Sequence, residues 1–481
     1  MRPEQTQLIF SDRVMTGCSS DAIGPRLLEI TDGLITRVDE IERSQIAAAV
    51  TPDAEVTDLG THLVTPAFIN SHTHLSMNVY RGIGLAAMAG NIVEDLYFHL
   101  ESTLTAAEVR AFSRMGAYDC LLSGIGMVWD HYYHAQSVAD ALMDVGVTGV
   151  VAPTLQDLNG PGVQWLDQQW IATDAITHGR AYEKSGIYSA LGPHATDTVS
   201  DSLWRKISDW AAKENIPIHA HVGQSIEEYE RNITDYGCSP VARLGRLGVL
   251  ASPVAFLLVH GQFVSRDDLG LLDKERHVLG HCPYSQVQFC FPAPVSIWQE
   301  AGIGIALGTD SGACNDTMNV QQELRLLAEG PTYRVTHSHL RRSFAEQSTQ
   351  TTARSLDQFR VDERKNRTFM NDTHALLDTV WKTPGKIHPK VKCGQLRAGH
   401  LANLTVWNLE HPAIWPANDI QRSLAYADAA QALHGVMTKG VWRGKLGNFA
   451  NSILNSDDFK QAQAEAVRRF DELKTRLGLK T

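Results

Sequence analysis

The sequence contains few cysteines, and their spacing does not suit a paired function. Seven cysteines occur in 481 residues, an odd and scattered set without a Cys-x-x-Cys motif: Cys18, Cys120, Cys238, Cys282, Cys290, Cys314 and Cys393. This pattern argues against a disulfide framework and against a zinc site built from thiolates. It favours free thiols in a reducing compartment, so we predict a cytoplasmic protein.

Long apolar runs and an excess of positive charge are also absent. The first residues lack the apolar core of a signal peptide, and no apolar stretch is long enough to span a bilayer. The formal net charge of −11 gives no reason to expect a nucleic acid as partner. We therefore expect a small-molecule substrate, with neither a membrane nor a nucleic acid involved.

Strand-like and helix-like segments alternate through the middle of the chain. Eight strand-like segments occur at 63–69, 126–129, 149–153, 186–191, 216–221, 255–259, 277–279 and 304–307. Helix-like stretches such as 106–123 and 202–214 lie between them. This order predicts an α/β fold, a (β/α)8 TIM-like barrel, whose active site lies at the carboxyl ends of the strands.

Short strand-like segments flank this region on both sides. They lie at 7–10, 27–30, 34–38 and 54–56 before it and at 404–407 and 435–442 after it, and a helix is expected at 456–477. Neither flank is large enough to fold alone, so we expect one small β-sandwich formed from both chain ends. The predicted units are residues 1–65 and 389–450 for the sandwich, 66–388 for the barrel and 451–481 for the C-terminal helix.

The segment 331–367 follows the eighth strand as a long, partly basic excursion. A surface loop or a helix pair is the first expectation for it. A lid over the barrel mouth or a subunit contact is the alternative, because long loops often carry function.

Polar side chains follow several of the predicted strands. His72 and His74 end the first strand, where the two-residue period of a strand points both imidazoles to one face. Imidazole or carboxylate side chains also occur at the ends of later strands: His219, His221, His260 and Asp310. Imidazole and carboxylate groups suit zinc, iron or nickel and leave a position open for water, whose pKa such a metal lowers towards about 7. The expected reaction is hydrolysis at an electrophilic carbon, although spacing alone does not choose between His219 and His221.

Together these motifs resemble the amidohydrolase superfamily, and within it the branch of triazine hydrolases and nucleoside or S-adenosylhomocysteine deaminases. The resemblance covers nearly the whole chain. It rests on His72-Thr73-His74, His221, His260 and Leu307-Gly308-Thr309-Asp310, with support from Met77-Asn78-Val79-Tyr80-Arg81-Gly82, Gly192-Pro193-His194 and the segment 394–404.

The resemblance implies a role for each of these positions. One divalent metal, zinc first and iron as the alternative, would be held by His72, His74, His221 and Asp310. Asp310 would also take a proton from the attacking water, and His260 would polarise the attacked group. The substrate would contact His194, His281 and Arg81. A second metal with His260 as a ligand is the alternative, although no lysine follows strand four to bridge two ions. Family members also suggest a homo-oligomer.

The chain departs from this resemblance at position 224. Deaminases of the branch carry glutamate there, three residues after the ligand histidine, to move a proton to the leaving group. Gln224 donates a hydrogen bond but cannot shuttle a proton at neutral pH. Glu227 or Glu228 could supply the carboxyl from the next helical turn, another group could do so, or the substrate does not need the step.

The favoured function is hydrolysis of a carbon–nitrogen bond in a small, heteroaromatic compound, with deamination first. Gln224 gives weight to alternatives: hydrolysis of an aryl urea, carbamate or amide, or of a halide on a triazine-like ring. A different kind of function is also open: the barrel could be inactive as an enzyme and bind a small ligand or a partner. Asp130, His131 and His134 follow strand two, where pocket lining and helix capping are equally open.

Overall fold

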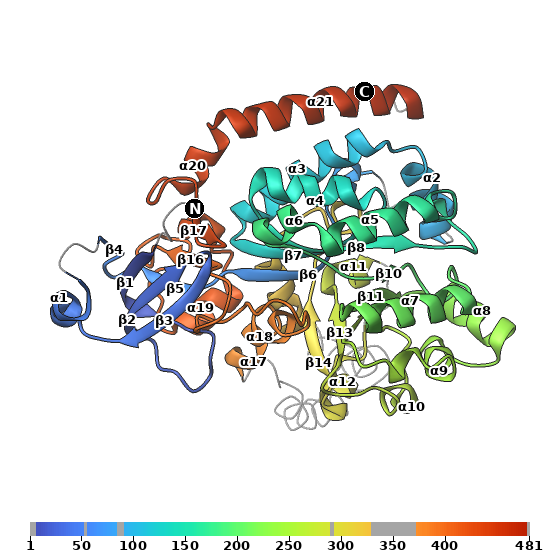
Figure 1. The fold of residues 1–481 in the computed structure, drawn as a ribbon, viewed down its shortest axis with the longest axis horizontal. Coiled ribbons are helices and arrows are strands. Elements are labelled where there is room, and N and C mark those ends of the chain that lie inside the picture. The colour runs from blue at the N-terminus through green and yellow to red at the C-terminus, as the bar shows by residue number, and fades with distance from the viewer. Residues whose placement is uncertain (1–5, 52–54, 84–90, 289–292, 329–371, 479–481) are drawn as a thin grey trace, which may run out of the picture.

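The computed structural model describes residues 6–51, 55–83, 91–288, 293–328 and 372–478 (Figure 1). The predicted excursion at 331–367 therefore lies outside the described residues. Within the described residues, no helix has the length and apolar character needed to cross a membrane.

Parallel strands in two sheets form the centre of the molecule. The first sheet contains β6 (Phe68–His74), β7 (Ile125–Tyr132), β8 (Thr148–Leu155), β9 (Ile187–Ser189), β10 (Gly192–Pro193) and β15 (Asp310–Ser311). The second contains β11 (Ile218–Val222), β12 (Phe256–His260), β13 (His277–His281) and β14 (Gly304–Leu307). Nearly every residue of these strands is buried, which explains their continuous apolar runs.

The two parallel sheets are linked at both of their edges. Isolated parallel bridges join Leu191 to Ile218 and Ala195 to His221, which brings β11 beside the end of the first sheet. At the other edge, β14 leads almost directly into β15, and β15 pairs in parallel with β6 at Asp310 and Thr73. The carboxyl ends of these strands therefore meet on one side of the molecule.

Helices follow the parallel strands along the chain (Figure 1). They are η2 (Leu75–Tyr80), η4 (Val93–Tyr97), α2 (Phe98–Glu101), α3 (Ala106–Leu122), α4 (Ala135–Val145), η5 (Pro161–Trp165), α5 (Leu166–His178), α6 (Arg180–Ser185), α7 (Asp201–Glu214), α8 (Ile226–Tyr236), α9 (Pro240–Arg246), η6 (Val249–Ala251), α10 (Arg266–Leu269), α11 (Pro283–Gln288), α12 (Val295–Ala301), α13 (Gly312–Asn315), α17 (Thr373–Asp378) and α18 (Lys382–Gly385). The sequence supplies their ends: α3 starts in a capping box of Thr105 and Glu108, and α4 stops at Gly146, whose φ of 82° suits glycine.

Strands from both chain ends form one mixed sheet. Its members are β1 (Gln7–Val14), β2 (Gly24–Thr31), β3 (Leu34–Glu40), β4 (Val56–Asp58), β5 (Leu63–Pro66), β16 (Leu404–Trp407), β17 (Leu433–Thr438) and β18 (Val441–Arg443). β5 pairs with β1 on one side and antiparallel with β16 on the other. Only Ala67 separates β5 from β6, so this sheet leads directly into the strand that ends at His74.

The remaining helices belong to the chain ends. They are η1 (Arg43–Gln45), α1 (Ile46–Ala49), α19 (Ile420–Tyr426), η7 (Ala430–Ala432), α20 (Phe449–Leu454) and α21 (Asp457–Leu477). α21 lies along α3 (Figure 1), with Phe459 edge-on against Tyr118 at 5.1 Å and Arg476 paired with Glu108 at 2.8 Å. Its bounds agree closely with the helix expected at 456–477.

Candidate metal centre and its cavity

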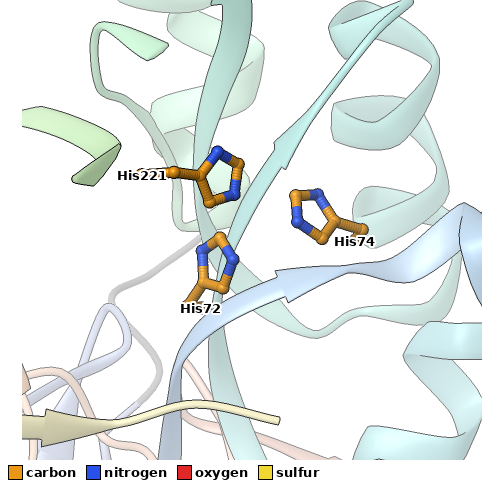
Figure 2. Close-up of side chains that lie close together, drawn as sticks. All are labelled: His72, His74 and His221. Atoms are coloured by element: carbon orange, nitrogen blue, oxygen red, sulfur yellow. The ribbon is translucent and has the colours of Figure 1, made fainter. Parts of the chain in front are cut away.

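Three imidazoles converge where β6 and β11 end (Figure 2). One nitrogen each of His72, His74 and His221 lies within 4.8 Å of the others. The His72 ring is nearly perpendicular to the other two rings, and its centroid lies 4.7 Å from that of His74 and 5.0 Å from that of His221. His72 and His221 are buried, and His74 is half-buried. Nitrogen atoms at such separations can bind one ion.

Asp310 and His260 complete the cluster from two other strand ends. Ligand atoms of His72, His260 and Asp310 also lie within 4.8 Å of one another. Asp310 Oδ1 is 3.6 Å from His74 Nε2, and its Oδ2 is 4.0 Å from His260 Nε2. The structure thus brings the four predicted ligands and His260 around one point.

The protonation of these groups fits a divalent transition metal. Burial, followed by the influence of His74, holds the pKa of His72 well below its ordinary value. Burial also lowers the pKa of His74, although Asp310 opposes this effect. A neutral imidazole offers a lone pair to a metal, and the buried Nε2 of His72 has no hydrogen-bond partner among the described residues.

Backbone carbonyl groups orient two of the imidazoles. His74 Nδ1 lies 2.5 Å from the carbonyl oxygen of His131, and His221 Nδ1 lies 2.8 Å from that of His194. Donation from Nδ1 to these oxygens leaves each Nε2 free to bind a metal, as is usual for metal-binding histidines. The strand ends thereby fix both the tautomer and the ring orientation.

His219 stands behind the cluster. Its Nε2 lies 2.8 Å from Nδ1 of His72, and the two rings are perpendicular. His221, two residues further along β11, is the member of the pair whose nitrogen faces His72 and His74. The geometry therefore favours His221 as the ligand and gives His219 the role of a hydrogen-bond partner.

The Asp310 carboxylate is held by a residue that sequence reasoning missed. The buried Ser285 hydroxyl donates a hydrogen bond of 2.9 Å to Asp310 Oδ2. Asp310 and His260 both adopt left-handed backbone conformations, with φ of 62° and 79°. Such conformations are uncommon outside glycine and concentrate at functional sites. The only sequence signal for Ser285 was its position shortly after strand seven.

Gly308 lies where the backbone after β14 approaches β6. A Cβ atom there would stand 2.6 Å from the carbonyl oxygen of His72 and 2.7 Å from its backbone nitrogen. We predict that Gly308→Ala lowers the free energy of unfolding by about 2–4 kcal/mol and the metal content by more than about half, because the clash separates Asp310 from His72. Urea denaturation and elemental mass spectrometry measure both effects.

Gly304→Ala is the matched control, because its Cβ would meet only side chains, at 3.3 Å from Thr383 Cγ2 and 3.6 Å from Val278 Cγ2. It should leave the metal content unchanged. Wild-type metal content and stability in Gly308→Ala would contradict the importance of this approach.

A cavity of about 60 Å³ adjoins the cluster. Of the predicted residues outside the ligand set, His194, Gln224 and His260 line it. The full lining consists of His74, Met77, Val93, Tyr97, Phe98, Glu101, His194, His221, Gln224, His260, Asp310, Ser311 and Cys314.

The structure does not bring Arg81 or His281 into this lining. Arg81 follows η2 and faces a different cavity beneath α21, where its Nη2 pairs with Asp119 Oδ2 at 2.6 Å. The His281 ring packs edge-on against Trp298 at 5.6 Å. Arg81 therefore has a structural partner in place of the predicted substrate contact, because η2 turns the chain away from the cluster.

Asp130, expected to follow strand two, lies within β7 and is likewise a structural residue. Its Oδ2 accepts a hydrogen bond of 2.7 Å from the backbone nitrogen of Leu75, and burial raises its pKa to about 7. It fixes the turn directly after His74.

Glu101 is a second residue that sequence reasoning missed. It ends α2, is 7% exposed and lines the cavity. Burial raises the pKa of Glu101 to about 8, and the Tyr132 hydroxyl partly offsets this effect. No motif marked it, because it lies in the connection between strand one and α3.

Glu228 does not take the place of the glutamate that is missing at 224. It is fully buried, and its Oε2 accepts a hydrogen bond of 2.7 Å from the backbone nitrogen of Gln224. Its Oε1 accepts another from Thr196 Oγ1 at 2.5 Å. Glu228 therefore positions the backbone of Gln224 from outside the cavity lining.

Comparison with known proteins gives three kinds of match. The model of the amidohydrolase family matches residues 63–356. A 5-methylthioadenosine/S-adenosylhomocysteine deaminase of Thermococcus kodakarensis is 27% identical over 397 residues, which cover 81% of this chain and 84% of that protein. A 5′-deoxyadenosine deaminase of Methanothrix thermoacetophila is 28% identical over 281 residues, or 57% of this chain and 65% of that protein.

Two solved structures show the same fold. An adenosine deaminase from Xanthomonas campestris with bound zinc has a TM-score of 0.79 at 19% identity, with 98% of each chain covered. An atrazine chlorohydrolase from Arthrobacter aurescens, complexed with zinc, has a TM-score of 0.76 at 17% identity, with 96% of this chain and 99% of that chain covered.

Proposed function

The chain belongs to the amidohydrolase family of metal-dependent hydrolases that act on carbon–nitrogen bonds, and from this we propose that it deaminates a small, nucleoside-like heteroaromatic substrate. The observation that carries the proposal is the cluster of His72, His74, His221 and Asp310 beside a cavity. Two of the relatives are named as deaminases of adenine-containing compounds, which supports this substrate class.

We propose that His72, His74, His221 and Asp310 hold one divalent metal, with zinc first and iron as the alternative. When bound, the metal would act as a Lewis acid that makes water nucleophilic at neutral pH. Asp310 accepts the proton of the attacking water, because Ser285 and the neighbouring imidazoles hold its carboxylate in place. His260 donates a hydrogen bond to the group under attack from the other side of Asp310.

The remaining lining residues would orient the substrate. His194 and Phe98 present rings 5.4 Å apart on one side of the cavity, which suits a flat heteroaromatic ring. Glu101 is the lining carboxyl outside the ligand set and is placed to bind a polar part of the substrate. Gln224 would hold a ring nitrogen by a hydrogen bond without moving a proton.

Gln224 also favours a second candidate function. A substrate that needs no proton shuttle at this position would be an aryl urea, a carbamate or amide, or a halogenated triazine-like ring. The product separates these candidates, because deamination releases ammonia and the others release a larger amine or halide.

The proposal includes the architecture predicted from the sequence. The ten parallel segments β6–β15 would close into a (β/α)8 barrel over residues 66–388, with β9 and β10 counted as one strand and β14 and β15 as another. The pairing of β15 with β6 and the bridges to β11 support this closure. Residues 1–65 and 389–450 would form the sandwich, and residues 451–481 the C-terminal helix. Homo-oligomerisation and a cytoplasmic location stay predictions.

The test is ammonia release from the zinc-loaded protein. We expect release from at least one of 5′-methylthioadenosine, S-adenosylhomocysteine and 5′-deoxyadenosine, and we expect Gln224→Glu to change kcat by less than about tenfold. Glu227→Gln, on the same turn but outside the cavity lining, is the control. If Gln224→Glu creates deamination from almost none, ring deamination is not the native activity, and release of amine or halide becomes the readout.

A further inference from the structure

One wall of the cavity consists of η4 and α2, residues 93–101. Val93, Tyr97, Phe98 and Glu101 of this wall all line the cavity. η4 is a π-helix, a form that is rare and frequent at functional sites. The wall contacts the end of the fourth strand through Phe98 and His194.

The cavity behind this wall is too small for the proposed substrate. Its volume of about 60 Å³ has room for a few water molecules. Sites for small molecules usually measure about 300–1,000 Å³. Part of the lining must therefore move before a substrate enters.

Arg231 on α8 ties the wall to Asp197, which follows β10. Its Nη1 forms an ion pair with Glu94 of η4 and a second with Asp197 Oδ2 at 3.1 Å. The three side chains differ in exposure: that of Asp197 is 7% exposed, Glu94 24% and Arg231 37%. The contact with Glu94 is the more exposed of the two, so water and salt weaken it more.

We propose that Arg231 is a positioning residue that latches the wall 93–101 over the cavity, and that Glu94 leaves Arg231 when substrate enters while Asp197 keeps the guanidinium in place. The identity of the substrate rests on the proposed function, but the latch does not. A partly exposed ion pair suits repeated opening, because its strength is small compared with the stability of the fold.

Glu94→Gln tests the latch and leaves the pair between Arg231 and Asp197 intact. We expect amide hydrogen exchange in residues 93–101 to become at least about threefold faster, the change that loss of a partly exposed ion pair produces. We expect KM for the deaminated nucleoside to fall by about threefold while kcat changes less than about twofold, because the variant no longer has to break the ion pair before substrate enters. Asp95→Asn is the matched control, because it removes the same charge from an exposed neighbour in η4.

Arg231→Lys and Arg231→Met provide a second, independent pair of variants. The lysine variant keeps the charge and should keep exchange slow, whereas the methionine variant removes both ion pairs and should speed exchange in residues 93–101 at least as much as Glu94→Gln does. Unchanged exchange and KM in Glu94→Gln, or equal effects in Asp95→Asn, would overturn the latch. Faster exchange in a zinc-loaded protein whose wild type deaminates none of the nucleosides would support the latch and overturn the proposed substrate.

Discussion

Replacing His221 with alanine is expected to reduce the metal content from about one equivalent to less than about 0.1, and kcat/KM by at least about ten-thousandfold. His221 is the imidazole that β11 adds to the two from β6, and its Nδ1 contact with the His194 carbonyl holds the ring in place. Without it, two imidazoles from one strand and a carboxylate remain. Elemental mass spectrometry on desalted protein and the ammonia assay measure both losses.

His219→Ala is the matched control for this prediction, since it removes the same side chain two residues away on β11. It deletes the hydrogen bond of 2.8 Å to His72 but not a proposed ligand, so we expect a loss of about 10–100-fold in metal affinity. If His219→Ala loses the metal and His221→Ala retains it, the assignment of the two histidines is reversed.

Asp310→Asn is expected to lower kcat by about a thousandfold or more and to leave at least about half of the metal bound. Asparagine keeps the shape and one oxygen of the side chain but cannot accept the proton of the attacking water. The variant therefore separates proton transfer from metal binding. Single-turnover rates and metal content, measured on the same preparation, distinguish the two effects.

Ser285→Ala is the companion variant. It removes the hydrogen bond of 2.9 Å to Asp310 Oδ2 and should lower kcat about tenfold. The carboxylate can still accept a proton, but it is no longer held in one orientation. If Asp310→Asn retains kcat within tenfold of the wild type, the proton of the water goes to another group.

The strand ends of the site could be predicted from the sequence because their residues show both the two-residue period of a strand and side chains that bind metals. His72 and His74 share a face of any strand, and a parallel arrangement brings His260 and Asp310 to the same side of the molecule. The alternation of strands and helices could also be predicted, because the hydrophobic pattern of each segment is local in the chain. Fold and cluster thus follow from patterns that are local in the chain.

Contacts that depend on how connections fold could not be predicted in this way. Glu101 reaches the cavity because η4 and α2 fold back towards β11, whereas Arg81, close to His74 in sequence, is turned away by η2. Ser285 acts through a hydrogen bond to Asp310, and Glu228 accepts one from Thr196, so each contact joins two separate segments. Such contacts depend on tertiary packing, so no fixed spacing between residues in the sequence reveals them.

The pairing of β5 with β16 has a consequence for the order in which the protein is made. β5, at residues 63–66, continues into the strand of His72 and His74, but its antiparallel partner lies at residues 404–407. On the ribosome this edge stays unpaired until most of the chain has emerged, and such long-range pairing forms slowly. The cluster of His72 and His74 also needs His221 and Asp310, which lie much later in the chain, so we expect the metal to enter a nearly complete protein and not a growing chain.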